Sequence, residues 1–359
     1  MHRARLNGIR KVMSERGLNA FLVTNMSNVF YLSGFTGSTA AVVVTSEAAY
    51  ILVDPRYSIQ ARMECGDGIE ARDYTSVSTV EAAGQLINEL KSDVVGYESE
   101  NLTVASLRRL RRTTGAQVKL RSTVGKVEML RSVKDAHEIA LIKHACGIVD
   151  STFDIIVREI KPGMTESEIA LLIDSTMRRL GAAHEGFSTI AAAGINSACP
   201  HHSPVDAALS DGQFLKMDFG AEYQRYNSDI TRTIFIGKPT DKHREVYQVV
   251  LNAQMKAIEA IAPGKTGREI DAVAREYIAS CGYGENFSHS LGHALGIDVH
   301  DGPGFSKSSN IVLEPGMVIT VEPGIYIEGW GGVRIEDDVL VTDTGHETLT
   351  TADKRLIRK

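Results

Sequence analysis

Two aspartates, Asp218 and Asp229, lie close together in the stretch MDFGAEYQRYNSDITRT. Asp218 follows the apolar run QFLKM, and Asp229 opens the run DITRTIFI, so each is expected where a strand side chain faces the core. Burying a carboxylate without a partner is unfavourable. The rest of the chain is therefore expected to place positive charge beside these two aspartates.

Histidines followed by carboxylates occur in both parts of the second half of the chain. On strand-like runs we find first His201, Asp218 and Asp229, and later His293, His300, Glu322 and Glu336. Four carboxylates that converge in a medium of low dielectric repel one another, so either their pKa values rise or cations neutralise them. Two divalent metal ions balance four negative charges. Carboxylates with one imidazole form a hard site that suits Mn²⁺ and accepts Co²⁺, Fe²⁺ or Zn²⁺.

A weak internal repeat accompanies this pattern. The stretch KPGMTESEIALLIDSTMRRLG aligns with APGKTGREIDAVAREYIASCG further along the chain. Thr165 with Glu168, and Thr266 with Glu269, have the spacing of capping boxes that begin a helix, and a glycine ends each copy. We therefore expect a two-fold arrangement of strands that closes over a shared acidic centre.

The first 125 residues have the pattern of a separate α/β unit. We expect a helix over about 3–16, strands at AFLVT, AAVVVT, AAYILVD and DVVGYE, and a helix at STVEAAGQLINELK. The charged stretch KLRSTVGKVEMLRSVKD is interpreted as the junction, because it has little apolar periodicity, and the long helix DAHEIALIKHACGIVDSTFDIIVREI follows it. The sequence predicts two domains, 1–125 and 126–359.

The composition is that of an ordinary globular protein, with 43% hydrophobic and 23% charged residues among 359. We expect no membrane partner, since no apolar run reaches the length of a membrane span and the basic N-terminus lacks the apolar core of a secretion signal. The run LRRLRR is interpreted as a solvated helix face, so no nucleic-acid partner is expected. The cysteines show no CxxC spacing, which favours reduced thiols in a cytoplasmic protein: Cys65, Cys146, Cys199 and Cys281.

The motifs MDFG, NSDITRT, HSLGH, VEPGIY and VRIED resemble those of the pita-bread metallopeptidases, which include methionine aminopeptidase, aminopeptidase P and prolidase. FYLSGFTGS and ILVDPRY resemble the N-terminal domain that prolidase, aminopeptidase P and creatinase share and that simple methionine aminopeptidases lack. The resemblance implies an α/β (α+β) chain. It would have a creatinase-like N-terminal domain, a C-terminal pita-bread fold with pseudo-two-fold symmetry, and a homodimeric assembly.

This resemblance also implies a ligand set for two divalent metal ions, with Mn²⁺ favoured. Asp229 and Glu336 would bridge the two ions, Asp218 would complete one site, and His293 with Glu322 would complete the other. Two ions in such a site lower the pKa of a shared water, which supplies hydroxide for attack on the scissile carbonyl. Glu322 is also assigned the proton shuttle.

Two further histidines, His201 and His300, match the family's two histidines that are not ligands. A neutral imidazole can donate to a carbonyl, and an imidazolium can protonate a leaving nitrogen. We assign His300 to stabilisation of the tetrahedral intermediate and His201 to substrate binding near the leaving group. The alternative is that both are core histidines with satisfied hydrogen bonds.

The neighbours of these residues are assigned from their positions. His289 is assigned to substrate binding in the pocket wall, with a plain strand residue as the alternative, and His202 has no assignment. Arg334, two residues before Glu336, is expected to orient that carboxylate from the same strand face. Asp338 is expected to be a capping or surface charge.

The hypothesis from these residues is a dinuclear-metal peptidase that cuts Xaa-Pro bonds at the N-terminus of short proline-containing peptides. A non-catalytic peptide-binding relative is the alternative, although all five ligand positions are filled. Many prolidases hold the carboxylate of a dipeptide with an arginine where this chain has Gly304, in VHDGPGF. We therefore expect an aminopeptidase P-like enzyme that also cuts dipeptides. A strict prolidase, with Lys307 as the carboxylate partner, is the alternative.

Overall fold

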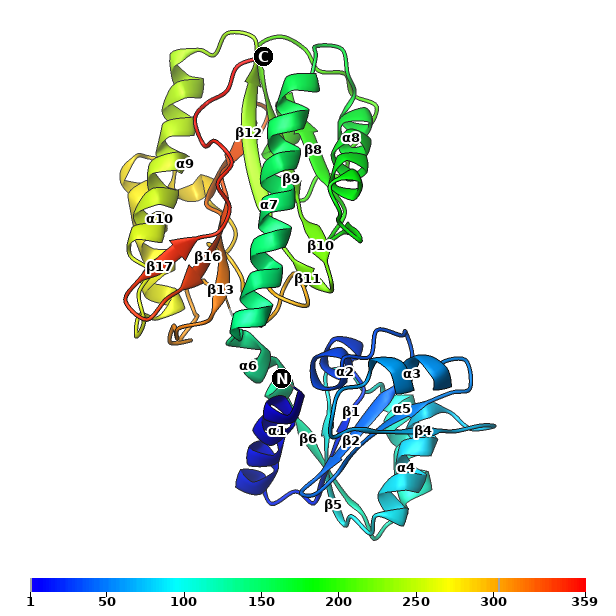
Figure 1. The fold of residues 1–359 in the computed structure, drawn as a ribbon. Coiled ribbons are helices and arrows are strands. Elements are labelled where there is room, and N and C mark those ends of the chain that lie inside the picture. The colour runs from blue at the N-terminus through cyan, green and yellow to red at the C-terminus, as the bar shows by residue number, and fades with distance from the viewer. Residues whose placement is uncertain (1, 303) are drawn as a thin grey trace. The chain divides into compact units, whose positions relative to one another are not determined.

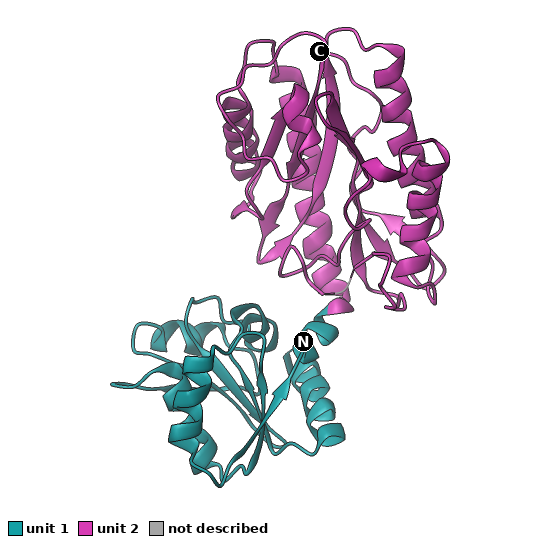
Figure 2. Cartoon of the chain, turned by 180° about the vertical axis from the view of Figure 1, so that it is seen from behind, with its two compact units in different colours: residues 1–131 teal, residues 132–359 magenta. Residues whose placement is uncertain are grey.

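A computed structural model describes residues 2–302 and 304–359, and the chain divides into two compact units, residues 1–131 and 132–359 (Figure 2). The stretch interpreted as a junction contains strand β6 (Lys119–Thr123) and helix α6 (Lys126–Ser132). The division comes at the end of α6. No helix in the described part of the chain is long and apolar enough to cross a membrane.

Unit 1 is built on a six-stranded mixed sheet with the strand order β4-β3-β2-β1-β5-β6. The strands β2 and β3 form an antiparallel pair, as their two apolar runs and short connection indicate, and β1 pairs in parallel with β5. In chain order the remaining elements are α1 (His2–Arg16), β1 (Ala20–Val23), α2 (Met26–Ser33), β2 (Ala41–Thr45), β3 (Ala49–Val53), α3 (Ser58–Glu64), β4 (Glu70–Asp73), α4 (Thr79–Glu89), β5 (Val94–Glu98) and α5 (Val104–Thr114).

Unit 2 has long helices on the outside of several small antiparallel sheets (Figure 1). Its first half contains α7 (Ala136–Glu159), α8 (Glu166–Arg179), β7 (His184–Glu185), β8 (Ile190–Ala193), η1 (Gly194–Ala198), β9 (Gln213–Phe219), β10 (Ala221–Tyr223), β11 (Tyr226–Asn227) and β12 (Ile230–Ile236). Its second half contains α9 (Asp241–Glu259), α10 (Gly267–Ser280), η2 (Gly284–Asn286), β13 (Val318–Val321), β14 (Gly324–Ile327), β15 (Gly331–Arg334), β16 (Asp337–Val341) and β17 (His346–Thr348).

The internal repeat corresponds to two structurally matching helix starts. Both capping boxes are formed: Thr165 and Glu168 cap α8, and Thr266 and Glu269 cap α10. The same backbone hydrogen bonds precede each helix, since Gly163 N donates to Leu209 O at 3.0 Å and Gly264 N donates to Leu313 O at 2.9 Å. The expected pseudo-two-fold symmetry therefore extends from the helices to the loops that pair with them.

Each half of unit 2 buries a helix pair against strands. One core packs α7 and α8 on β8, β9 and β12, and the other packs α9 and α10 on β13 to β16. Phe214 and Phe235, from β9 and β12, lie in the second core, whereas their neighbours on the opposite face lie in the first. The β9–β12 pair is thus covered on both faces, which explains why every residue of the two strands except Gln213 is buried.

Candidate metal centre

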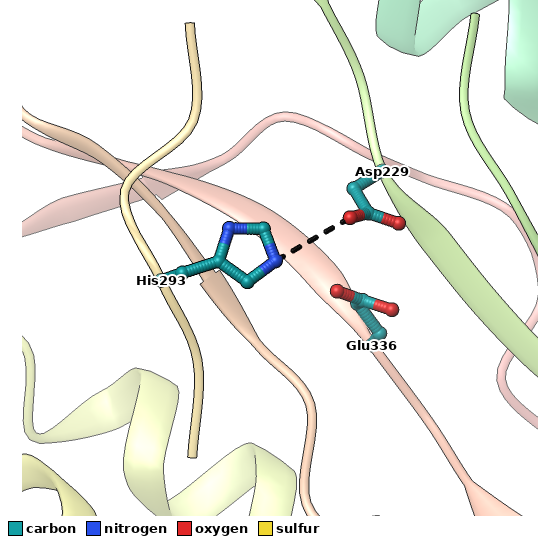
Figure 3. Close-up of side chains that lie close together, drawn as sticks. All are labelled: Asp229, His293 and Glu336. Atoms are coloured by element: carbon teal, nitrogen blue, oxygen red, sulfur yellow. Dashed lines mark ion pairs between the residues drawn. The ribbon is translucent and has the colours of Figure 1, made fainter. Parts of the chain in front are cut away.

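Three side chains from both halves of unit 2 meet at its centre. Asp229 directly precedes β12, Glu336 lies between β15 and β16, and His293 lies beside β13. Figure 3 shows the carboxylates of Asp229 and Glu336 and the imidazole of His293 pointing toward one another. One ligand atom from each lies within 4.8 Å of the others, and His293 Nε2 lies 3.5 Å from Asp229 Oδ2. These three groups can contact the same cation.

The orientation of His293 suits a metal ligand. Its Nδ1 lies 3.1 Å from the carbonyl oxygen of Ala294, and because a carbonyl only accepts, Nδ1 carries the proton. The backbone N–H of His293 donates to Thr320 Oγ1 at 3.0 Å. Burial, followed by the charge of nearby His300, lowers the pKa of His293 to about 4. The ring is therefore neutral, with the lone pair of Nε2 directed at the carboxylates.

The other two expected ligands border the same space. Asp218 is in β9, opposite Thr231 of β12, and Glu322 directly follows β13. Glu322 Oε1 lies 3.6 Å from His293 Nε2. All five expected ligands line one cavity of about 600 Å³. Strand ends from the two halves therefore deliver the whole set to one place.

Several carboxylate oxygens in this group lack a hydrogen-bond donor. Among the described residues, buried Asp218 Oδ1, Asp229 Oδ1 and Glu336 Oε1 have no partner. Burial and the neighbouring carboxylates raise the pKa values of Asp229 and Glu336 well above their usual range, and burial raises the pKa of Glu322 to about 8. Divalent cations would bind the unpaired oxygens and remove the repulsion between the carboxylates. These residues therefore fit a dinuclear centre.

The raised pKa values give an expected pH dependence for the metal-free protein. From about pH 4.3, the usual pKa of glutamate, up to about pH 8, the folded state holds protons that the unfolded chain has released, so the free energy of unfolding falls as pH rises. We expect the metal-free protein to have a melting temperature about 2–4 °C lower at pH 8 than at pH 6. This shift corresponds to a loss of about 1 kcal/mol in the free energy of unfolding.

Thermal melts of chelator-treated protein at the two pH values measure this effect. Mn²⁺ should restore more stability at pH 8 than at pH 6, because the ligands then bind it without losing protons. Glu322→Gln removes one titrating group and should flatten the dependence. A metal-free protein that is more stable at pH 8 would contradict this picture of the site.

Arg334 has a different direct partner from the one expected. Its Nη2 forms a very short contact with Asp218 Oδ2, and its Nε donates to Thr231 Oγ1 at 3.0 Å. Thr231 Oγ1 in turn donates to Glu336 Oε2 at 2.6 Å. Arg334 therefore pairs with Asp218, lies with its Nε 3.9 Å from Glu322 Oε2, and is linked to Glu336 by hydrogen bonds through Thr231, because β15 ends at Arg334 and Glu336 lies between β15 and β16. Thr231 lies within the motif NSDITRT, but the sequence analysis gave it no role.

Asp338 is fully buried, so the expectation of a capping or surface charge is wrong. Its Oδ2 accepts the backbone N–H of Asp229 at 2.9 Å and lies 3.3 Å from Cys146 Sγ of α7. Burial raises the pKa of Asp338 well above its usual range. The carboxyl group of Asp338 thus holds the backbone at Asp229 through this hydrogen bond. The buried run DDVLV of β16 was the available signal for its burial.

His201 and His300 lie at the junction of two cavities. A second cavity of about 560 Å³ adjoins the first, and five residues line both: His201, His293, His300, Glu322 and Arg334. Both non-ligand histidines are exposed, which excludes the alternative of core histidines. The rings of His293 and His300 lie edge to face with centroids 4.2 Å apart. A bound molecule that spans the cavities would pass His201 and His300.

His289 and His202 are engaged by the protein itself. His289 lines the second cavity, but its Nδ1 lies 2.7 Å from Ser290 O and its Nε2 lies 2.9 Å from the Tyr326 hydroxyl. Burial, followed by the charge of Arg334, lowers the pKa of His289 to about 3, so it is a neutral wall residue. His202, which had no assignment, contacts the buried carboxylate of Glu166 at 2.7 Å.

Comparison with known proteins identifies the family. The model of metallopeptidase family M24 matches residues 140–343, which is more than half of the chain and contains all five expected ligands. The chain belongs to metallopeptidase family M24. The model of the creatinase/prolidase N-terminal domain matches residues 5–133. Membership in this family makes the chain a metallo-exopeptidase with the mixed α/β architecture that its motifs indicated.

Several M24 relatives are similar over nearly the whole chain. An Xaa-Pro dipeptidase from Pyrococcus horikoshii is 37% identical over 97% of this chain and 97% of its own. The solved structure of an Xaa-Pro dipeptidase from Bacillus anthracis is 39% identical, with a TM-score of 0.97 and full coverage of both chains. An X-Pro aminopeptidase structure from Thermotoga maritima is also 39% identical, with a TM-score of 0.89 over 96% of this chain and 99% of that one.

Proposed function

We propose that this protein is a dinuclear-metal exopeptidase that hydrolyses Xaa-Pro bonds at the N-terminus of peptides, including dipeptides. The observation that carries the proposal is the group of buried carboxylate oxygens without donors, which faces His293 Nε2 where two cavities meet. The test is to treat the protein with a chelator and measure its hydrolysis of a panel of Xaa-Pro peptides before and after addition of Mn²⁺ or Co²⁺. Equal activity in both states, or no hydrolysis after addition, would refute it.

Each residue of the centre has a separate task in this proposal. Asp229 and Glu336 would be shared by the two ions, and Asp218, His293 and Glu322 would complete the set of residues that holds them. When bound, the metal ions supply Lewis-acid polarisation of the scissile carbonyl and activation of an attacking water. Among the described residues, no N–H or O–H group donates to the buried oxygens Asp218 Oδ1, Asp229 Oδ1 and Glu336 Oε1. These oxygens are therefore available to the ions.

The proton-handling groups stand on the cavity side of the centre. Glu322 lines both cavities, so its carboxylate can pass a proton from the water to the leaving nitrogen. His300 donates its N–H to the oxygen on which negative charge develops. His201 holds the substrate near the leaving group. His289 shapes the wall of the second cavity through its contact with Tyr326.

Preference for proline rests on the relatives, whose names specify Xaa-Pro or X-Pro substrates. The physical reason is that an Xaa-Pro bond has no amide N–H and carries a rigid ring, so peptidases that bind the backbone N–H fit it poorly. The two solved relatives that are equally identical to this chain are named as a dipeptidase and as an aminopeptidase. The preferred peptide length must therefore be argued from this chain's own residues.

The loop after His300 offers no guanidinium to a dipeptide carboxylate. Gly304 occupies the expected arginine position, and a Cβ there would lie 2.4 Å from Gly292 O and from His293 Cα. Among the described residues that line the two cavities, Arg334 is the one lysine or arginine, and it is paired with Asp218. A dipeptide gains little from its free carboxylate here, and a longer peptide loses nothing.

We therefore expect Ala-Pro-Ala to be cut at least as efficiently as Ala-Pro under one metal condition. The measurement is kcat/KM for both peptides. A dipeptide preference of tenfold or more, which is about 1.4 kcal/mol, would make strict dipeptidase the correct description. Lys307→Ala identifies the cause in that case, since exposed Lys307 is the nearby cation on this loop. Loss of the preference in this variant would assign the carboxylate contact to Lys307.

Three finer properties complete the proposal. Mn²⁺ is proposed as the working metal because oxygen ligands dominate the site. A cytoplasmic location is proposed because each of the four cysteines is a free thiol, including exposed Cys199. A homodimer is proposed because two-fold assemblies are the commonest oligomers. Metal analysis of protein purified without added metal tests the first, and light scattering in solution tests the third.

A further inference from the structure

The loop between β8 and β9 carries His201 past the junction of the two cavities. It begins with η1, continues through Cys199 and Pro200 to His201, and is largely exposed from there to the start of β9. A loop of this exposure does not hold a side chain in place by hydrophobic packing. Two fully buried charged side chains hold it instead, one at each end.

Lys216 of β9 holds the part of the loop before His201. Burial lowers the pKa of Lys216 to about 6, but its fully buried Nζ is surrounded by acceptors, since it donates to three backbone carbonyls, at 3.2 Å to Ser197 O, 2.7 Å to Cys199 O and 3.2 Å to Pro200 O. An ammonium has three N–H bonds, so these carbonyls use all of its donors. The same group lies 5.2 Å from the centre of the Tyr326 ring, at cation–π distance.

Glu166 holds the loop from the other side with the opposite charge. It begins α8, is fully buried, and accepts four donors: Ala193 N at 2.6 Å, Asn196 Nδ2 at 3.0 Å, His202 Nε2 at 2.7 Å and Val205 N at 3.1 Å. Glu166 therefore accepts hydrogen bonds from the loop and its flanking residue Ala193, and Lys216 donates hydrogen bonds to the carbonyls of the loop. His201 lies between His202, held by Glu166, and Pro200, held by Lys216.

The second half of unit 2 has no charged residue at the position that corresponds to Glu166. Gly267 occupies the repeat position that matches Glu166, and a Cβ there would lie 2.8 Å from Gly304 O in the loop after His300. That loop packs directly on the start of α10. Both loops hydrogen-bond to the start of their helix through the backbone, but only in the first half does a side chain at this position, Glu166, also bind the loop among the described residues. The charged residues are thus specific to the loop that carries His201.

We propose that Lys216 and Glu166 are positioning residues that clamp the 194–205 loop and thereby fix His201 between the two cavities. The inference rests on the proposed role of His201 in peptide hydrolysis. Lys216→Met keeps the length of the side chain but removes the Lys216 donor from Ser197 O and Cys199 O, while Pro200 O still accepts from Arg334 Nη1 at 3.3 Å. Glu166→Gln keeps the shape of the side chain but removes the charge. Glu168→Gln is the matched control, because Glu168 is exposed on the same helix and its hydrogen bonds among the described residues are those of the capping box with Thr165.

Amide hydrogen exchange of the metal-loaded protein tests the clamp without an activity assay. We expect peptides within residues 194–203 to exchange at least tenfold faster in Lys216→Met and in Glu166→Gln than in wild type and in Glu168→Gln. Metal content should stay unchanged, which separates an effect on the loop from an effect on Asp218. Unchanged exchange in both clamp variants, or a loss of metal that accompanies faster exchange, would overturn the inference.

A double-mutant cycle tests whether the clamp acts through His201. We expect Lys216→Met to lower kcat/KM for Ala-Pro-Ala by tenfold or more in wild type and by less than twofold in His201→Ala. Equal losses in both backgrounds would show that Lys216 acts without His201. Should Lys216→Met fail to fold, Lys216→Gln and Glu166→Gln provide the same cycle. Absence of hydrolysis in wild type would refute the proposed function, and hydrogen exchange would still decide on the clamp.

Discussion

Asp229→Ala is expected to abolish peptide hydrolysis while the fold persists. Asp229 and Glu336 are the carboxylates that both ions would share, so the loss of either leaves uncompensated positive charge at the centre. Metal-ion catalysis supplies several kcal/mol of transition-state stabilisation, which corresponds to a rate loss of about 10³-fold or more. Glu336→Ala should behave in the same way.

Stability should move in the opposite direction from activity in this variant. The raised pKa of Asp229, which burial and the charges of Glu336 and Asp218 cause, shows that its carboxylate is destabilising when no cation is present. Chelated Asp229→Ala should therefore melt no lower than chelated wild type. Asp154→Ala, on the exposed face of α7, is the control and should keep full activity. Wild-type turnover by Asp229→Ala at saturating Mn²⁺ would disprove the bridging role.

His300→Ala is expected to lose activity but to keep both metal ions. His300 lies at the junction of the two cavities, with its ring centroid 4.2 Å from that of His293, and its proposed role is to donate to developing negative charge. Removing one such donor typically costs about 10²- to 10³-fold, mostly in kcat. The loss should be smaller in KM, because the ground-state carbonyl needs the donor less.

Elemental analysis beside steady-state kinetics decides this prediction. His137→Ala, at an exposed histidine on α7, is the matched control and should change neither quantity. If His300→Ala loses metal in proportion to its activity, His300 is a ligand and the choice between the two histidines must be reversed. A variant with unchanged kcat would remove His300 from the mechanism.

The sequence allowed the elements and the grouping of the site to be predicted because both depend on local patterns. The capping boxes at Thr165 and Thr266 depend on residues three apart, and both form as expected. The apolar runs before Asp218 and after Asp229 identified β9 and β12, and their antiparallel pairing brings the two aspartates together. The repeat then indicated that the second half would deliver its ligands to the same place.

Partners across the sheets could not be predicted in this way. Arg334 meets Asp218 rather than Glu336 because strand pairing and the end of β15 at Arg334 decide which side chains face each other. Asp338 supports Asp229 from a position 109 residues away, and Glu166 reaches His202 from 36 away. Such contacts follow from register and loop path, which leave no periodic signal in a single sequence.

The glycine at 304 limits how this enzyme can change its substrates. A side chain there must displace the backbone of Gly292 and His293, so one substitution toward the arginine of prolidases would disturb His293, the proposed metal ligand, before it could capture a carboxylate. The shortest mutational route to dipeptide specificity is therefore closed. Directed evolution for dipeptide specificity should begin instead at Ser306 or Ser309, because both residues line the second cavity.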